Sequence, residues 1–159
     1  MVKTLVLGIG NPILSDDAVG LRVIDELQNF SPGAEVQLLK DSSAGINLLE
    51  ILSGFDRAIL VDAIQTGTEP GTVFCLTPED IPARQKTPHL HNLDLLQVLV
   101  LGKELAPAMP SEVSIIAIEA KDVTTFGEDL TPEVKKAVPL AVQQILAQLR
   151  SERETETLR

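Results

Sequence analysis

The stretch LGIGNPILSDDAVGLRVIDEL, residues 7–27, joins a strand-like apolar run to two glycines and then to two adjacent carboxylates where a helix should begin. The apolar run KTLVLGI at residues 3–9, closed by glycine, predicts a buried strand. Apolar side chains then recur at near-helical spacing from Asp17 to Phe30, with Ser15 as the expected N-cap and a Pro-Gly pair at the end. The stretch therefore predicts a strand, a tight loop and a helix.

The rest of the chain repeats this alternation. Further strands are expected at residues 35–40, 57–63 and 112–119 and from Thr72, and further helices at 46–52, 91–102 and 131–149. Because parallel neighbours need crossover connections, this order predicts a single three-layer α/β domain, with a mostly parallel five-stranded twisted sheet and helices on both faces. The strand from Thr72 follows a short connection, so it is expected to run antiparallel to its predecessor. The domain should span residues 1–150, followed by a polar, frayed tail at 151–159.

Charge and cysteine content limit the possible partners and compartment. Lys and Arg total 13 against 23 Asp and Glu, so the net charge of −10 disfavours nucleic acid and acidic membranes as partners. Cys75 is the only cysteine, which excludes an internal disulfide and favours a reducing compartment, with the cytoplasm as the expected location. A free cysteine in a strand behaves as a small core hydrophobe, so Cys75 is expected to be buried. No apolar run approaches the ~18 residues of a membrane span, so no membrane insertion is expected.

The opening stretch resembles a dinucleotide-binding loop only in part. Gly8 and Gly10 match the first two glycines of G-x-G-x-x-G, but Ile13 occupies the third position. Asp16 and Asp17 place negative charge where a phosphate would lie, and no Walker loop is present. The sequence therefore does not predict a nucleotide site.

Asp16 and Asp17 have two interpretations. Acids in the first turn of a helix stabilise its dipole by roughly 0.3–1 kcal/mol each, so capping alone could explain the pair. However, Asp62 ends the apolar run RAILVDA, and the carboxyl ends of parallel strands form the ligand-binding edge of an α/β sheet. Asp62 could itself be a turn residue. Because Asp17 follows the first strand, both acids are expected at the same edge.

The only histidines, His89 and His91, lie in the segment PHLH. Either could simply hydrogen-bond a carbonyl, as many polar histidines do. Two carboxylates and one imidazole nevertheless make a mixed oxygen and nitrogen ligand set that suits a divalent transition metal and leaves positions open for a substrate. No fixed metal-binding spacing is present, so the residues alone leave both interpretations open.

At this point the chain resembles the endopeptidases that mature nickel–iron hydrogenases. The resemblance covers nearly all of residues 3–147 and is carried by four blocks in order: LGIGNPILSDDAVG, FDRAILVDAIQTGTEPGTV, HNLDLLQVLVLG and FGEDLTPEVKKAVPLAVQQI. It implies an enzyme that removes the C-terminal extension of the hydrogenase large-subunit precursor once nickel has been inserted. The nickel is then carried by the substrate, and other divalent ions could occupy the site in vitro.

The resemblance also implies which residues form the site. The family's catalytic and metal-binding positions fall on Asp17, Asp62 and His91, the last because HNLDLL matches the family's His, two residues, Asp pattern. Many members have glutamate in place of Asp17, so Asp16 remains a rival, and His89 could assist His91.

The sequence leaves the chemistry of peptide cleavage open. Either a carboxylate acts as general base or nickel polarises the water or the scissile carbonyl. Two aspartates sharing one proton, as in an aspartyl protease, would need to lie about 3 Å apart, and a metal between them argues against this. A non-cleaving, metal-sensing chaperone of the precursor and a small-molecule metal-dependent hydrolase are the alternatives.

Overall fold

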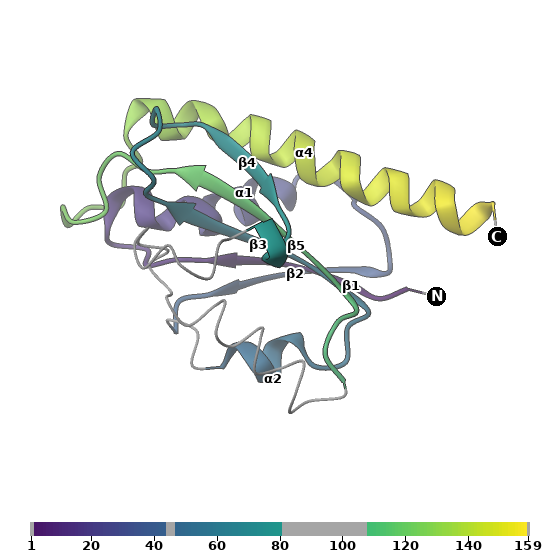
Figure 1. Ribbon diagram of the computed structural model, residues 1–159. Coiled ribbons are helices and arrows are strands. Elements are labelled where there is room, and N and C mark those ends of the chain that lie inside the picture. Colours follow the sequence, from purple (N-terminus) through teal and green to yellow (C-terminus); the bar gives the residue numbers. More distant parts are fainter. Residues whose placement is uncertain (1, 44–46, 81–107, 159) are drawn as a thin grey trace.

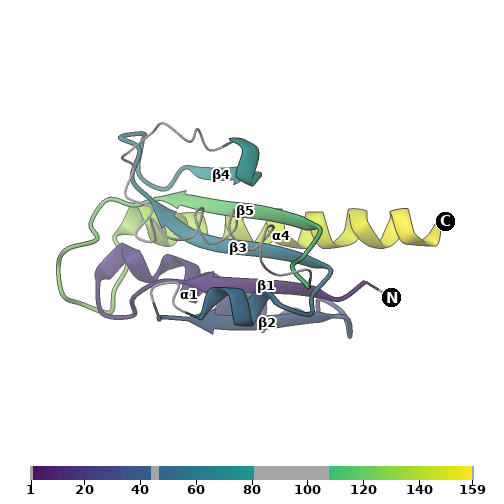
Figure 2. The same cartoon turned by 60° about the horizontal axis from the view of Figure 1, so that its bottom comes forward.

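In a computed structural model, which describes residues 2–43, 47–80 and 108–158, the chain forms a five-stranded sheet in the order β2-β1-β3-β5-β4 (Figures 1 and 2). The strands are β1 (Thr4–Ile9), β2 (Val36–Asp41), β3 (Arg57–Ile64), β4 (Val73–Leu76) and β5 (Glu112–Glu119). β1, β2, β3 and β5 are parallel, as predicted. β4 runs antiparallel, also as predicted, but it pairs with β5 instead of its predecessor β3.

Helices cover both faces of this sheet. They are the 3-10 turn η1 (Ser15–Ala18), α1 (Val19–Leu27), α2 (Leu48–Leu52), the 3-10 turn η2 (Pro78–Asp80) and α4 (Pro132–Thr157). α1 and α4 lie on one face and α2 lies on the other (Figure 1). This arrangement confirms the predicted three-layer α/β class. The helix expected at residues 91–102 lies outside the described residues.

The alternation of side chains along β3 decides where Asp62 points. Ile59 and Val61 belong to the core under α1 and α4, whereas Leu60 and Ile64 belong to the core on the α2 side. Since successive side chains of a strand point to opposite faces, Asp62 shares the α2 side with Leu60 and Ile64. A carboxylate therefore occupies a position whose neighbours along the strand are fully apolar.

Glycines allow α1 to approach the sheet closely at the carboxyl end of β1. A Cβ on Gly8 would overlap the carbonyl oxygen of Gly20, and one on Gly20 would overlap the backbone of Val61. A Cβ on Gly10 would overlap the carbonyl oxygen of Asp17. Because these obstacles are main-chain atoms, only glycine fits without moving the backbone. This contact holds η1, and Asp17 with it, against the edge of the sheet.

The beginning of the first helical segment differs from the prediction. Ser15 is not the N-cap of a helix starting at Asp17: η1 intervenes and α1 begins at Val19. Ser15 has a positive φ of 49°, and its hydroxyl donates to the carbonyl oxygen of Asp129 at 3.2 Å. A contact with a distant loop therefore replaces the expected local cap.

The C-terminal segment is more regular than predicted. α4 continues through the expected frayed tail to Thr157. The carboxylate of Glu152 lies 3.3 Å from the guanidinium of Arg57, which anchors this part of the helix to the start of β3. Although α4 is 26 residues long, no helix in the described part of the chain is long and apolar enough to cross a membrane.

The prediction that Cys75 is buried was wrong. Cys75 is exposed, because β4 lies at the edge of the sheet and has a neighbouring strand on one side only. Its thiol lies 3.6 Å from Oε1 of Gln144 on α4. Partial burial raises the pKa of the Cys75 thiol, which disfavours the reactive thiolate.

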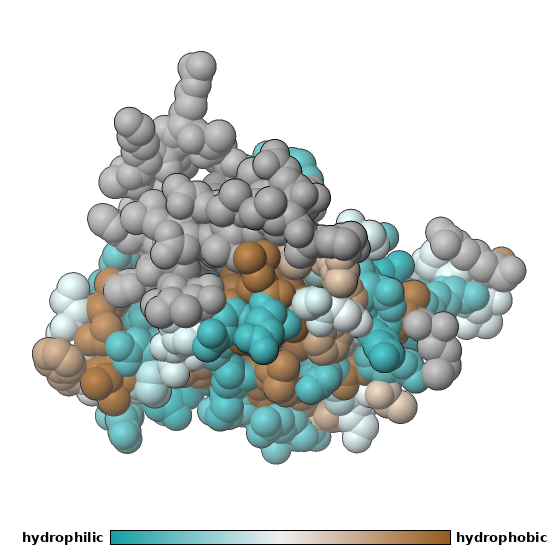
Figure 3. All heavy atoms as spheres, turned by 90° about the horizontal axis from the view of Figure 1, so that it is seen from below, coloured by the Kyte–Doolittle hydropathy of each residue, from teal (hydrophilic) through white to brown (hydrophobic). Residues whose placement is uncertain are grey.

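A few large apolar side chains remain exposed despite the two cores. They include Ile13, at 48% exposure, and Phe126, at 79%, in loops at the carboxyl end of the sheet, and Leu140, at 59%, on α4. Viewed from below, hydrophobic surface extends to the left-hand end of the molecule (Figure 3). In Figure 1 this is the end toward which the arrows of β1, β3 and β5 point.

Candidate active site

Asp62 is the most unusual charged residue at the carboxyl edge of the sheet. Its side chain is fully buried, and one oxygen, Oδ1, accepts a hydrogen bond from the backbone N–H of Ala63 at 2.8 Å. The other oxygen, Oδ2, is buried without a hydrogen-bond partner among the residues that the structure describes. Leaving a buried carboxylate oxygen unpaired is costly, so this position points to a ligand or to function.

Asp17 brings a second carboxylate to the same place. It is 2% exposed, and its Oδ2 accepts a hydrogen bond from the backbone N–H of Asn11 at 3.0 Å, across the loop that follows β1. Burial, and then the nearby negative charge of Asp17, raise the pKa of Asp62 well above its ordinary value. The structure thus brings together two of the three predicted site residues.

Asp16, the rival of Asp17, has a different environment. Its carboxylate is fully buried and accepts hydrogen bonds from the backbone N–H groups of Lys121 and Asp122 at 2.9 Å each. Thr131 donates its N–H at 2.8 Å and its hydroxyl at 2.8 Å to the two oxygens. With four donors around it, Asp16 fastens the loop before α4 to η1. We therefore assign Asp16 a structural role.

Glu119, at the end of β5, is a further buried acid that sequence reasoning did not single out. It is 2% exposed, and its carboxylate accepts the N–H groups of Thr66 and Gly67 at 2.8 and 2.9 Å, respectively. It thereby fixes the segment that follows β3. The signal was present, since Glu119 ends the strand EVSIIAIE just as Asp62 lies near the end of its strand.

The predicted third ligand, His91, and its neighbour His89 lie outside the described residues. Within residues 2–43, 47–80 and 108–158, no three His, Cys, Asp or Glu side chains gather as a set of metal ligands. Asp17 and Asp62 are therefore the two predicted ligands that the structure describes.

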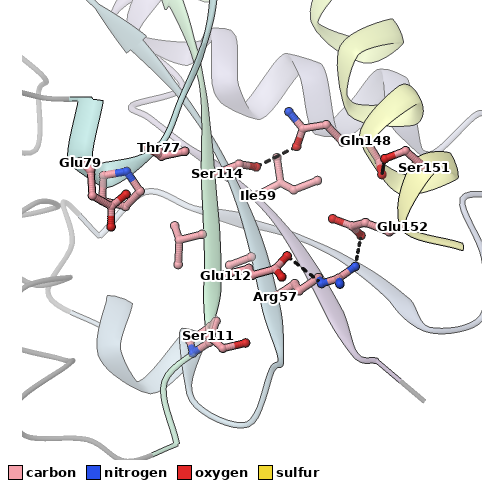
Figure 4. A pocket seen from close by; sticks show the side chains of 14 residues that line it. Arg57, Ile59, Thr77, Glu79, Ser111, Glu112, Ser114, Gln148, Ser151 and Glu152 are labelled. Carbon is pink, nitrogen blue, oxygen red and sulfur yellow. Dashed lines mark hydrogen bonds and ion pairs between the residues drawn. The ribbon is translucent and has the colours of Figure 1, made fainter. Parts of the chain in front are cut away.

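A cavity of about 520 Å³ lies at the opposite, amino edge of the sheet (Figure 4). Its polar side chains are largely engaged with one another: Arg57 pairs with Glu112 and Glu152, and Ser114 donates to Gln148. Among the described residues, no histidine or cysteine lines this cavity. The side chains of this cavity are therefore less suited to catalysis than those at the edge with Asp17 and Asp62.

Comparison with known proteins identifies the family. A family model described as hydrogenase maturation protease matches residues 21–148, which is most of the chain. The chain belongs to the hydrogenase maturation protease family. It is 32% identical over 155 residues to the hydrogenase 2 maturation protease of Escherichia coli K12, a match that covers 94% of this chain and 92% of that protein.

Solved structures of hydrogenase maturation proteases share the fold. The hydrogenase maturating endopeptidase HybD from E. coli superposes with a TM-score of 0.82 at 29% identity, over 95% of this chain and 94% of that one. The [NiFe] hydrogenase maturation protease HybD from Thermococcus kodakarensis gives a TM-score of 0.71 at 27% identity, covering 93% and 99%. These relatives confirm the expected family and mark the chain as a peptide hydrolase.

For a hydrogenase maturation protease, the paired acids suggest a simple electrostatic function. Two buried carboxylates repel each other, and a divalent cation between them would relieve that repulsion while giving Asp62 Oδ2 a partner. Carboxylate oxygens together with an imidazole suit a borderline ion such as nickel. Asp17 and Asp62 would supply two of the oxygen ligands that such a cation needs, without a thiol.

Proposed function

We propose that this protein is the endopeptidase that removes the C-terminal extension of the nickel–iron hydrogenase large-subunit precursor after nickel insertion. In this proposal, Asp17, Asp62 and His91 together recognise the nickel ion that the precursor carries. The single cysteine fits a reducing compartment, and we place the reaction in the cytoplasm.

The observation that supports this proposal most strongly is Oδ2 of Asp62. It is buried, without a partner among the described residues, and close enough to Asp17 for the second charge to raise its pKa. Such an arrangement is unfavourable in the free protein and becomes favourable when a cation arrives. A client that brings its own metal would therefore be preferred over the same client without metal.

The cleavage itself requires an activated water. A carboxylate of the pair can accept a proton from water as it attacks the scissile carbonyl, after which the C–N bond breaks and the departing amine takes up a proton. Because this scheme uses an aspartate as general base without a covalent intermediate, the protein would be an aspartyl protease in the broad sense, without the shared proton of the two-aspartate enzymes. The exposed thiol of Cys75 has a raised pKa and no role in the proposal.

The test is to incubate the purified protein with nickel-loaded and with nickel-free precursor and to measure the mass of the large subunit. We expect cleavage only of the nickel-loaded form. Asp17→Asn and His91→Ala should each reduce processing at least 100-fold, whereas Cys75→Ala should match the wild type. Binding of the nickel-loaded precursor without any change in mass would instead support a non-cleaving chaperone.

A further inference from the structure

Two exposed apolar side chains lie on adjacent loops at the carboxyl end of the molecule. Ile13 is 48% exposed and Phe126 is 79% exposed. The backbones are joined because Gly127 donates its N–H to the Ile13 carbonyl at 2.8 Å, while Ser15 donates its N–H to the Gly127 carbonyl at 3.0 Å. Leu14 and Gly127 form a parallel β-bridge, so Ile13 and Phe126, which precede them, are neighbours. We call this pair the apolar platform.

The loop that carries Phe126 is held in place by hydrogen bonds. The carboxylate of Asp122 accepts the N–H groups of Thr124 and Thr125 at 3.0 Å each. The Thr125 hydroxyl and then these N–H groups lower the pKa of Asp122 to about 2, so it is ionised at neutral pH. Asp16 binds both ends of the loop, as described above. A side chain presented on such a fixed loop loses little conformational freedom when it binds a partner.

The position of the platform relates it to the candidate active site. Ile13 precedes Asp17 by four residues, in the loop whose Asn11 N–H binds the Asp17 carboxylate. In Figure 1 the loop between β5 and α4 projects beyond the carboxyl ends of the parallel strands. The hydrophobic surface at the left of Figure 3 lies at this same end. A substrate that reaches Asp17 would therefore also pass the platform.

We propose that the apolar platform, Ile13 and Phe126, docks into an apolar pocket of the hydrogenase large-subunit precursor and anchors it beside the cleavage site. The inference rests on the proposed function, since it names the surface through which the same substrate is held. Phe is well suited to this role because one ring buries a large area with few rotatable bonds.

Charge around the platform indicates the kind of surface that it meets. Glu128 and Asp129 follow Phe126 in the same loop and are exposed, and the whole chain has a net charge of −10. A client pocket bordered by Lys or Arg would complement these acids. A second copy of this chain would bring the same negative charges together, which disfavours self-association through the platform.

The test measures processing of the nickel-loaded precursor and, separately, binding of the precursor. For Phe126→Ser we expect KM to rise roughly 10- to 100-fold, as the lost burial of one aromatic ring implies, with kcat within about twofold of the wild type. Ile13→Ser should act in the same direction, more weakly because its side chain is smaller. Leu140→Ser is the matched control: it removes an exposed apolar side chain from α4 and should leave both constants unchanged.

Binding is measured by calorimetry on the nickel-free precursor, which the proposed function predicts not to be cleaved, so that no substrate is consumed and Asp62 stays unchanged. The Phe126→Ser change should weaken binding there by the same factor as it raises KM. Unchanged binding and KM in Phe126→Ser would overturn the proposal that the platform binds the precursor, even if the wild type cleaves the precursor. Conversely, the wild type could bind the precursor in a way that depends on Phe126 but fail to cleave it. That outcome would contradict the proposed function and support the platform.

Light scattering tests whether a second copy of this chain, instead of the precursor, binds the apolar platform. We expect the wild type and Phe126→Ser to have the same monomeric mass at the concentrations of the assay. A wild-type dimer that becomes monomeric in Phe126→Ser would show that the platform binds a second copy, and would overturn the proposal.

Discussion

Charged side chains are paired differently at the two ends of the sheet. At the amino edge, the guanidinium of Arg57 lies 3.0 Å from Glu112 and 3.3 Å from Glu152, so a cation is flanked by two anions. At the carboxyl edge, Asp17 and Asp62 are both buried and carry charges of the same sign. The charges of the first arrangement compensate one another within the chain, whereas those of the second repel each other. Because groups with perturbed pKa values cluster at functional sites, we propose that the carboxyl edge, with its two like charges, is the functional one.

The largest effect is expected at Asp62. Asp62→Asn keeps the shape of the side chain but removes its charge, so processing of the nickel-loaded precursor should fall at least 100-fold. In a metal chelator the variant should be more stable than the wild type at pH 8, by about 1–3 kcal/mol, because a buried charge has been removed. Urea unfolding measures this, and a less stable, fully active variant would contradict the assignment.

The effect of Asp62→Asn on stability should depend on pH. The folded-state pKa of Asp62 lies above its unfolded value of about 3.9, so the folded protein holds the proton more tightly. Its contribution to stability is present below pH 3.9 or so and is lost as the pH rises through the folded-state pKa. The stability advantage of Asp62→Asn should therefore be small at pH 4 and grow toward pH 8. An advantage independent of pH would show that Asp62 does not titrate in this way.

The next largest effect is expected at Asp16, which lies beside the site but is fully hydrogen-bonded. Asp16→Ala leaves the N–H groups of Lys121, Asp122 and Thr131 without their acceptor and should cost about 3 kcal/mol or more of folding free energy. Urea unfolding measures the loss. Asp17→Asn is the matched neighbour and should cost much less, and equal losses would remove the distinction between the two acids.

A smaller effect is expected where the backbone positions Asp17. Gly10→Ala places a methyl group against the Asp17 carbonyl and should cost about 1–3 kcal/mol while also reducing processing. Gly127→Ala, which has open space around the new methyl group, should leave stability within about 0.5 kcal/mol of the wild type. If the two substitutions are equally harmless in urea unfolding, the close approach of η1 to β1 does not position the acid.

The smallest effect is expected at the amino edge. Glu112 is 64% exposed in its ion pair with Arg57, so Glu112→Gln should cost less than about 1 kcal/mol. Processing should be unchanged, because we place the reaction at the opposite edge. A loss of processing comparable to that of Asp62→Asn would remove the functional contrast between the two ends.

Sequence patterns predicted the strands well because strand formation here depends on local apolar runs. Residues 112–119 were predicted as a strand and form β5 with the same bounds, while RAILVDA became the start of β3. The partner of β4 was not predicted, because pairing with β5 depends on a segment that follows much later in the chain. The bounds of this strand could thus be predicted from the sequence, whereas the pairing of strands could not.

The site was predicted in part for the same reason. Asp17 and Asp62 could be placed at one edge from the order of strands, and the structure brings them together. The choice between Asp16 and Asp17 could not be made, because the donors that engage Asp16 come from more than 100 residues away. Ser15 was misjudged because its hydroxyl binds Asp129, a partner that no local pattern reveals. The assignment of His91 stays a prediction.

The hydrogen bonds of Asp16 have a mechanical consequence. Along the chain, 105 residues separate Lys121 from Asp16, yet in space a single carboxylate joins the loop bearing Phe126 to the residue next to Asp17. Movement of that loop would therefore be transmitted through the hydrogen bonds of Asp16 to the turn that positions Asp17. In our proposal, binding of the precursor at the apolar platform and the position of Asp17 are therefore coupled.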